Sequence, residues 1–389
     1  MRVTVKEAAM ATEHPCPSET LVSLPVRILT EAPSEPVLSV DGAFGAPGLN
    51  LSHWPGNETP VALKRDLSTG IALAFAELPA EERDSLAEGC TALVNNHFDT
   101  DGVLSMFTIL HPKTALASAP RLLDAAAAGD LFRCPSEDAF VLDSILTAFG
   151  DPDRSPHGSE LQGLADRERR QRATEHALAA LPGILGGDLT PYESLVRGPL
   201  EALRADQVDL QQAVPDDLVH LDYVVRTAPM GAESSRESAP HCFDPGRHAL
   251  WGAHLADRQL VLGPGESGTT CRFLIGTRSF FDLVTESSQP RPDLEALARE
   301  FNEAEGTSNA DEVAWRFQRI EGASPELWFG LEGLPEYAEH AGPWLAPSSI
   351  DPTRIKSLVV DAMRATWVWP EEQNENETLP STGAAHSDS

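Results

Sequence analysis

The sequence predicts an α/β protein, with a three-layer N-terminal domain around a mainly parallel sheet and a smaller C-terminal α+β domain. Three observations lead to this expectation. The chain of 389 residues is long enough for two domains. An apolar run over 90–94 precedes a stretch of helical periodicity over 103–110, as in a strand followed by its crossover helix. From Val219 onward the pattern changes to short β-like runs.

The two ends of the chain differ from the rest in composition. Residues 1–35 are rich in Pro, Glu, Ser and Thr with little periodicity, and we expect a disordered leader there. Residues 371–389 are acidic and poor in apolar side chains, and we expect a disordered tail. Between them lie the two predicted domains, 36–212 and 213–370, and the first includes a helical connector over about 160–210.

The expected elements of the first domain have recognisable boundaries. Val37–Val40 is an apolar run that ends in Asp-Gly and predicts a strand. Either Asp66 or Ser68 is expected to cap a helix whose apolar residues recur at helical spacing. An alanine-rich helix over 114–128 and a helix capped by Ser136 follow.

The second domain is predicted from shorter signals. β-like runs at 220–226, 259–262 and 272–276 indicate strands, and a glycine cluster between the last two is typical of a hairpin turn. Helices are expected to begin at Asp293 and at Asp351, each next to a proline.

The charge balance limits the possible partners. Lys and Arg number 29 against 60 Asp and Glu, which gives a net charge of −31. Such a surface repels polyanions, so long nucleic acid is disfavoured as a partner and a small anionic substrate is easier to accept. The basic cluster at 167–172 is interrupted by acid and is interpreted as a solvated helix face.

The cysteine and hydropathy patterns bear on location. Five cysteines are scattered without a Cys-x-x-Cys pair, which gives neither a disulfide framework nor a zinc ribbon. No apolar run approaches the length of a membrane span, and no secretory signal is recognisable. We therefore expect a cytoplasmic protein without a membrane partner, and the sequence indicates no particular oligomeric state.

The residues best suited to chemistry lie in one loop. His97, Asp99 and Asp101 alternate between the predicted strand and the predicted helix, so their loop is expected at the carboxyl edge of the sheet, where α/β folds bind ligands. One imidazole and two carboxylates within five residues suit a divalent cation such as Mn²⁺ or Mg²⁺. Asp-x-Asp-Gly is also a common turn, and aspartates cap helices, so this pattern alone leaves both interpretations open.

Further acidic and imidazole side chains lie on either side of this loop. Asp41 ends the first predicted strand, and His53 lies in a Pro- and Gly-rich loop that excludes a helix. Asp130 follows the alanine-rich helix.

These stretches resemble motifs of the DHH phosphoesterase superfamily, which includes RecJ-like nucleases, nanoRNases and manganese pyrophosphatases. Residues 97–105, His-Phe-Asp-Thr-Asp-Gly-Val-Leu-Ser, look like its first motif, and residues 40–42, Val-Asp-Gly, look like its second. Residues 52–60 resemble the segment around the Asp-His-His signature, and residues 66–70 resemble the helix start that follows it. Residues 127–130 resemble the part that carries the remaining metal-binding aspartate.

The resemblance covers about residues 36–150 and departs from the superfamily in two ways. The first-motif lookalike follows the others, which implies a circularly permuted domain. Ser52 and Trp54 occupy the places of the signature Asp and second His. The His-Trp-Pro-Gly-Asn and Asn-Asn-His-Phe-Asp-Thr-Asp-Gly loops together also look like those of an uncharacterised bacterial family.

The resemblance implies a divalent-metal-dependent phosphoesterase, with Mn²⁺ favoured and a nucleotide, dinucleotide or pyrophosphate as substrate. The implied metal ligands are Asp41, His53, His97, Asp99, Asp101 and Asp130. Among them, the implied catalytic residues are His53, His97, Asp99 and Asp101. The incomplete signature leaves a second possibility open, which is a non-catalytic ligand-binding or interaction protein on a degenerate phosphoesterase scaffold.

Overall fold

The computed structural model describes most of the chain between the two predicted disordered ends. The described residues are 24–43, 45–232, 234–235, 243–333, 339–340 and 342–368. The acidic tail over 371–389 and the first 23 residues of the predicted leader lie outside them.

The N-terminal half is built on a four-stranded sheet in which every pair of neighbours is parallel, in the order β1-β4-β2-β3. Its strands are β1 (Val26–Ile28), β2 (Val37–Val40), β3 (Gly48–Leu51) and β4 (Leu93–Asn95). β2 is buried along its whole length, as expected of a central parallel strand. The sheet confirms the α/β class and the mainly parallel pairing predicted from the sequence.

Helices pack against this sheet and against one another around one large apolar core. In chain order they are η1 (Val61–Leu63), α1 (Ser68–Glu77), α2 (Ala80–Leu86), α3 (Thr100–Leu110), α4 (Pro112–Ala117), α5 (Ala119–Leu131), α6 (Glu137–Gly150), α7 (Gly158–Leu161), α8 (Asp166–Leu185), η2 (Thr190–Tyr192) and α9 (Glu193–Gln212).

The C-terminal half contains a six-stranded mixed sheet in the order β5-β6-β7-β8-β10-β9. Its strands are β5 (Val214–Leu218), β6 (Tyr223–Thr227), β7 (Arg258–Pro264), β8 (Thr269–Ile275), β9 (Ala314–Phe317) and β10 (Glu326–Gly330). Only β6 and β7 pair in parallel, and the other neighbours are antiparallel. The helices of this half are η3 (Val219–Leu221), α10 (Arg247–Ala253), α11 (Leu294–Glu305), η4 (Gly342–Trp344) and α12 (Pro352–Thr366).

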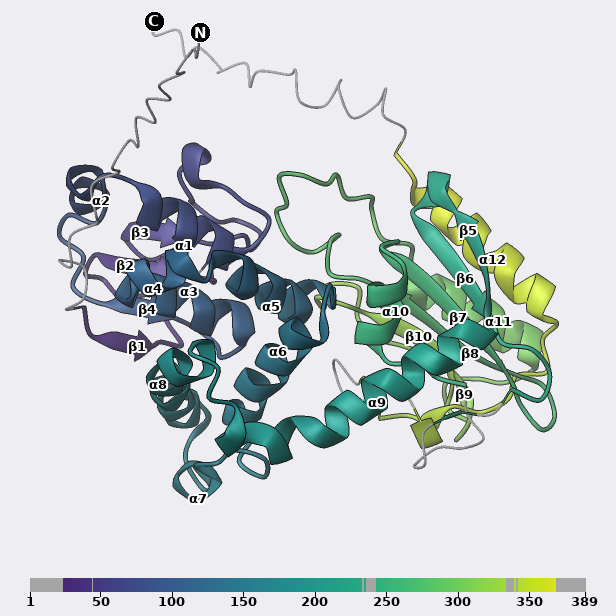
Figure 1. Ribbon diagram of the computed structural model, residues 1–389. Helices are drawn as coiled ribbons and strands as arrows, with labels where there is room; N and C mark the ends of the chain where they lie inside the picture. Colours follow the sequence, from purple (N-terminus) through teal and green to yellow (C-terminus); the bar gives the residue numbers. More distant parts are fainter. Residues whose placement is uncertain are drawn as a thin grey trace, which may run out of the picture.

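This second sheet has an apolar cluster on each face. Side chains of α11 and α12 pack on one face, and side chains of α9 and α10 pack on the other. The long helix α9 extends from the N-terminal half to the C-terminal half (Figure 1). Of the predicted helical connector over about 160–210, α9 is the element that packs with both halves.

Several boundaries differ from those predicted. The first strand begins at Val26, inside the segment expected to be a disordered leader up to residue 35. The alanine-rich helix is two helices, α4 and α5, because Pro120 is tolerated only in the first turn of a helix and so requires a new start. β3 occupies part of a loop predicted to be irregular, and β9 and β10 carry no clear alternation.

Candidate metal centre

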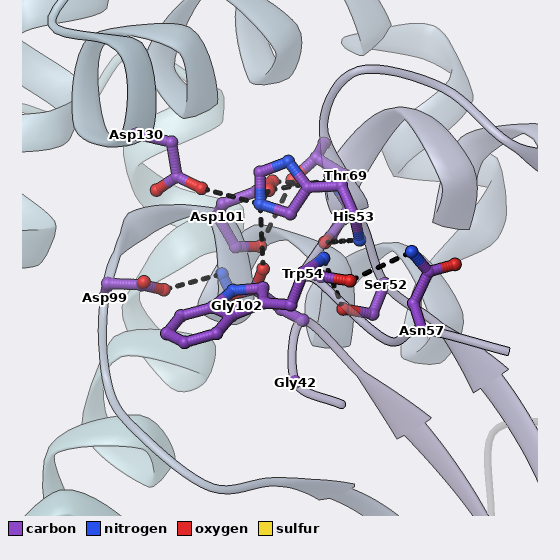
Figure 2. A network of polar contacts seen from close by, with 12 residues as sticks. Gly42, Ser52, His53, Trp54, Asn57, Thr69, Asp99, Asp101, Gly102 and Asp130 are labelled. Carbon is purple, nitrogen blue, oxygen red and sulfur yellow. Dashed lines mark hydrogen bonds and ion pairs between the residues drawn. The ribbon is translucent and has the colours of Figure 1, made fainter. Parts of the chain in front are cut away.

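Six candidate side chains meet at the carboxyl edge of the parallel sheet. Because parallel strands end at the same edge, the loops that follow β2, β3 and β4 lie side by side there. These loops and the adjoining ends of α3 and α5 supply Asp41, His53, His97, Asp99, Asp101 and Asp130. The sequence predicted each of these residues, and the fold brings all six together. Figure 2 shows His53 between Asp101 and Asp130.

The donor atoms form two groups that share one carboxylate. In the first group, Nε2 of His53 lies 3.0 Å from Asp130 Oδ2, 3.5 Å from Asp41 Oδ1 and 3.7 Å from Asp101 Oδ2. In the second group, Nε2 of His97 lies 2.8 Å from Asp99 Oδ2 and 3.1 Å from Asp41 Oδ2. Within each group the donor atoms lie within 4.8 Å of one another. Asp41 therefore directs one oxygen toward each group, as a bridging carboxylate would.

Several of these atoms are buried without a hydrogen bond. Both carboxylate oxygens of Asp41, Nε2 of His53 and Oδ2 of Asp130 have no hydrogen-bond partner among the described residues. The close approaches at 3.0–3.5 Å lack the alignment that a hydrogen bond requires. Unpartnered buried charge is costly, so these atoms fit a bound cation better than an empty core.

Hydrogen bonds from outside the cluster orient the two imidazoles. Nδ1 of His53 lies 2.7 Å from the carbonyl oxygen of Asp66, and Nδ1 of His97 lies 2.6 Å from Oδ1 of Asn96. Each Nδ1 therefore carries a proton and donates it, which directs each Nε2 toward the carboxylates. Nε2 of His97 donates a second hydrogen bond, of 2.8 Å, to Oδ2 of Asp99, and a bound metal ion would take the place of that proton.

The carboxylates are held by backbone amides. The two oxygens of Asp101 accept hydrogen bonds of 2.7 Å from the backbone N–H groups of Ser68 and Thr69, at the start of α1. Asp99 caps α3 by accepting a 2.8 Å hydrogen bond from the N–H of Gly102. The capping role and the ligand role are thus compatible in Asp99, because the other oxygen faces His97.

The cluster has more negative than positive charge. Burial raises the pKa of Asp41 well above its usual range, and the charges of Asp99 and Asp101 add to this effect. Burial also raises the pKa of Asp130, again reinforced by Asp101 and Asp99. Burial acts in the same direction on Asp99, but the adjacent His97 outweighs it and lowers the pKa of Asp99 to about 2. A cation at this site would stabilise the ionised carboxylates.

The backbone at Asp41 adopts a conformation that few residues tolerate. Its φ of 49° lies in the left-handed region, where aspartate and asparagine are the least costly side chains after glycine. A sparsely populated backbone conformation at a residue with unpartnered buried oxygens points to a functional constraint there.

A loop of the C-terminal half closes one side of the cluster. The ring of Phe281 stacks on His53 with centroids 3.9 Å apart and an interplanar angle of 15°. The N–H of Asp282 donates to the carbonyl oxygen of His53, at 2.8 Å. Phe281 belongs to the apolar core of the N-terminal half although it lies beyond β8 in the chain.

Asp66 corrects one prediction. We expected Asp66 or Ser68 to cap α1, but the residue before this helix is Leu67, whose side chain makes no capping hydrogen bond. The carboxylate of Asp66 instead accepts hydrogen bonds from the N–H groups of Val284 and Thr285, at 2.7 and 2.9 Å. Asp101 accepts the hydrogen bonds of the first N–H groups of α1, and Asp66 holds the C-terminal loop in place.

Ser52 makes its hydrogen bonds within its own loop. Its hydroxyl accepts a 3.0 Å hydrogen bond from the N–H of Trp54. The hydroxyl of Thr59 donates to the carbonyl oxygen of Ser52, at 2.8 Å. Ser52 therefore supports its own loop and provides no ligand to the cluster.

A cavity of about 780 Å³ lies next to the cluster, between the two halves. His97, Asp99 and Asp130 form part of its wall. Other residues that line it, such as His248 and Phe281, could not be predicted from the sequence because no local motif surrounds them.

Comparison with known proteins identifies the family. A model of a family of unknown function, DUF6687, matches residues 24–374. The chain belongs to this family. No curated protein and no solved structure matches the chain. In the described part of this DUF6687 protein, no helix combines the length and the apolar composition needed to cross a bilayer.

Proposed function

We propose that this DUF6687 protein is a divalent-metal-dependent phosphoesterase that hydrolyses a small phosphorylated substrate in the cytoplasm. The favoured ion is Mn²⁺, with Mg²⁺ as the alternative. The observation that carries the proposal is the buried cluster of four aspartates and two histidines, in two groups that share Asp41. Oxygen and imidazole donors of this kind suit Mn²⁺.

The residues have distinct roles in this proposal. Asp41 bridges the two groups, while His53, Asp101 and Asp130 complete one and His97 and Asp99 complete the other. Divalent cations held there would supply a nucleophile at neutral pH and neutralise charge on the phosphoryl group. His53 and His97 keep their Nε2 atoms toward the reaction site because their Nδ1 protons are already engaged.

Water exclusion is the second contribution of the protein. Phe281 covers His53, and Trp54 lies with its ring centroid 5.0 Å from that of His97. These rings lower the local dielectric, which strengthens the interaction of the carboxylates with a cation and with developing charge.

Manganese calorimetry on the metal-stripped protein tests the metal site. We expect saturable Mn²⁺ binding in the wild type and its loss in Asp41→Asn, His53→Ala and Asp99→Asn. Asp84→Asn, on the exposed surface of α2, serves as the matched control and should bind as the wild type does. Undiminished Mn²⁺ affinity in Asp41→Asn would contradict the bridging assignment.

A second candidate function is favoured by Ser52. Since Ser52 makes only local hydrogen bonds where the superfamily has an aspartate, the protein could bind a phosphorylated ligand without hydrolysing it. Metal-dependent release of phosphate or of an alcohol from any phosphoester would exclude this alternative. Tight Mn²⁺ binding with no turnover of any phosphoester would support it.

A further inference from the structure

The cavity beside the metal centre is much larger than one phosphate group requires. Its volume of about 780 Å³ is in the range of pockets that enclose a whole organic ligand. It lies between the halves, with α6 on one side, α9 on another and residues of the C-terminal half opposite the cluster. A substrate that fills it has a substantial part beyond the phosphate at the metal centre.

Apolar side chains line much of the cavity. They are Phe98, Phe132, Phe140, Pro199, Leu203 and Phe281. Three of these aromatic rings are at least nine-tenths buried, so they are held in place by the surrounding core. Such a surface favours an apolar organic group, because contact with it removes apolar area from water.

The charged groups in this wall are unfavourable for a second phosphate. Nδ1 of His248 lies 3.3 Å from Glu339, and its Nε2 lies 3.6 Å from Asp143, so two carboxylates already surround this imidazole. Nε2 of His340 lies 2.7 Å from Asp206. A second phosphate would approach these carboxylates and lose hydration without gaining an unshared cation.

Arginine and lysine are scarce around the cavity. Among the described residues that line it, Arg154 is the one with a guanidinium or ammonium group, and it lies on the exposed rim. Binding sites for polyphosphates use several such groups, because each phosphate needs donors and positive charge. The site therefore suits one phosphate group at the metal centre and an uncharged organic group in the rest of the cavity.

We infer that the substrate is an ester of a single phosphate with a bulky, apolar organic group, and that pyrophosphate and nucleoside triphosphates are poor substrates. This inference rests on the proposed phosphoesterase function. In the reaction, the oxygen of water forms a new bond to phosphorus and the bond from phosphorus to the ester oxygen breaks. The departing oxygen takes up a proton that the water loses, which gives an alcohol and phosphate.

Helix α9 provides a direct test of this assignment. Ala202 lines the cavity, whereas Ala205, on the same helix, does not. Ala202→Trp fills part of the space for the organic group, and Ala205→Trp makes the same change in side chain outside it. Neither residue touches the metal cluster, so Mn²⁺ binding serves as the check that both variants are folded.

The experiment compares kcat/KM of the full-length, Mn²⁺-loaded protein on 1-naphthyl phosphate, inorganic pyrophosphate and ATP. We expect 1-naphthyl phosphate to be preferred by at least about tenfold, and Ala202→Trp, but not Ala205→Trp, to lose about tenfold on it. Preference for pyrophosphate or ATP, or equal activity of the two Trp variants, would overturn the inference and leave the phosphoesterase proposal intact. Absence of turnover on all three compounds would contradict both this inference and the phosphoesterase proposal.

Discussion

In the C-terminal half, a buried cluster of charges is balanced within the chain, whereas in the N-terminal half it is not. Arg272 donates to Glu326 at 2.5 and 3.0 Å and to Asp244 at 3.0 Å, and all three side chains are almost completely buried. Arg247 forms a further ion pair with Glu326. Two guanidiniums thus face two carboxylates.

In the metal centre, by contrast, four carboxylates face two imidazoles whose Nδ1 atoms are engaged elsewhere. Among the described residues, no hydrogen-bond partner reaches either oxygen of Asp41. A balanced buried cluster holds elements of the fold together, while an unbalanced one indicates a counter-charge from outside the chain. The difference between these clusters separates a structural network from a candidate binding site.

The largest expected effect comes from breaking the balanced cluster. Glu326→Gln leaves two buried guanidiniums with less compensating charge and should lower the free energy of unfolding by about 3 kcal/mol. Denaturant titration measures this change. Glu175→Gln is the control, because Glu175 pairs with Arg172 on the exposed surface of α8 and should cost less than about 1 kcal/mol. Equal losses of stability in the two variants would contradict the structural role of the balanced cluster.

Removing a charge from the unbalanced cluster should instead raise the free energy of unfolding. Asp41→Asn relieves a buried, unpartnered carboxylate and is compatible with the left-handed φ of 49°. In chelator we expect the variant to be about 1–3 kcal/mol more stable than the wild type. With saturating Mn²⁺ the order should reverse, because only the wild type gains stability from the ion. Thermal unfolding in chelator and in saturating Mn²⁺ measures the two differences in stability. If Asp41→Asn is less stable than the wild type in chelator, the cluster does not hold excess negative charge.

His248 joins the two halves and allows a test by pH. Although burial acts to lower its pKa, the flanking carboxylates of Glu339 and Asp143 outweigh this and raise it to about 10. A histidine with a raised pKa stabilises the fold fully below its unfolded value of ~6.5, and this stabilisation is lost as the pH rises to about 10.

We therefore expect the free energy of unfolding to fall over this pH range, and to fall more than in His248→Gln. The lowered pKa of Glu339 arises from the same ion pair, so the two effects are not additive. The measurement is denaturant unfolding at several pH values. Parallel pH profiles for wild type and variant would contradict the assignment.

The smallest effect concerns the glycine at the start of α3. A Cβ at Gly102 would lie 2.3 Å from Nδ2 of Asn95 and 2.9 Å from Oδ2 of Asp41. Gly102→Ala should destabilise the protein by about 1 kcal/mol and weaken Mn²⁺ binding. Gly183→Ala, in α8 with open space around it, should instead stabilise by up to ~1 kcal/mol. A stabilising Gly102→Ala would show that the cluster is less tightly packed than described.

The sequence predicted the local part of the candidate site better than the distant part. His97, Asp99 and Asp101 lie within one strand–loop–helix unit, so their proximity follows from local geometry. Asp41 and Asp130 were predicted from resemblance to motifs, and the fold places both beside that unit.

The covering residues could not be predicted in this way. Phe281 reaches His53 from a loop of the other half, and His248 reaches the carbonyl oxygen of Ala128, at 3.0 Å, from α10. Both contacts join residues more than 100 positions apart. Neither residue belongs to a periodic pattern or a motif, and only the docking of the two halves brings them to the cluster.

The stacking of Phe281 on His53 has a consequence for the order of events during translation. All six candidate ligands leave the ribosome well before Phe281, and about 70 residues separate the end of α9 from this ring. At ordinary rates of synthesis, the side of the cluster that Phe281 later covers stays open for roughly 4–14 s after the N-terminal half is complete. For a cation bound in that interval, folding of the C-terminal half would close the side that Phe281 covers, while the side lined by His97, Asp99 and Asp130 would still face the cavity.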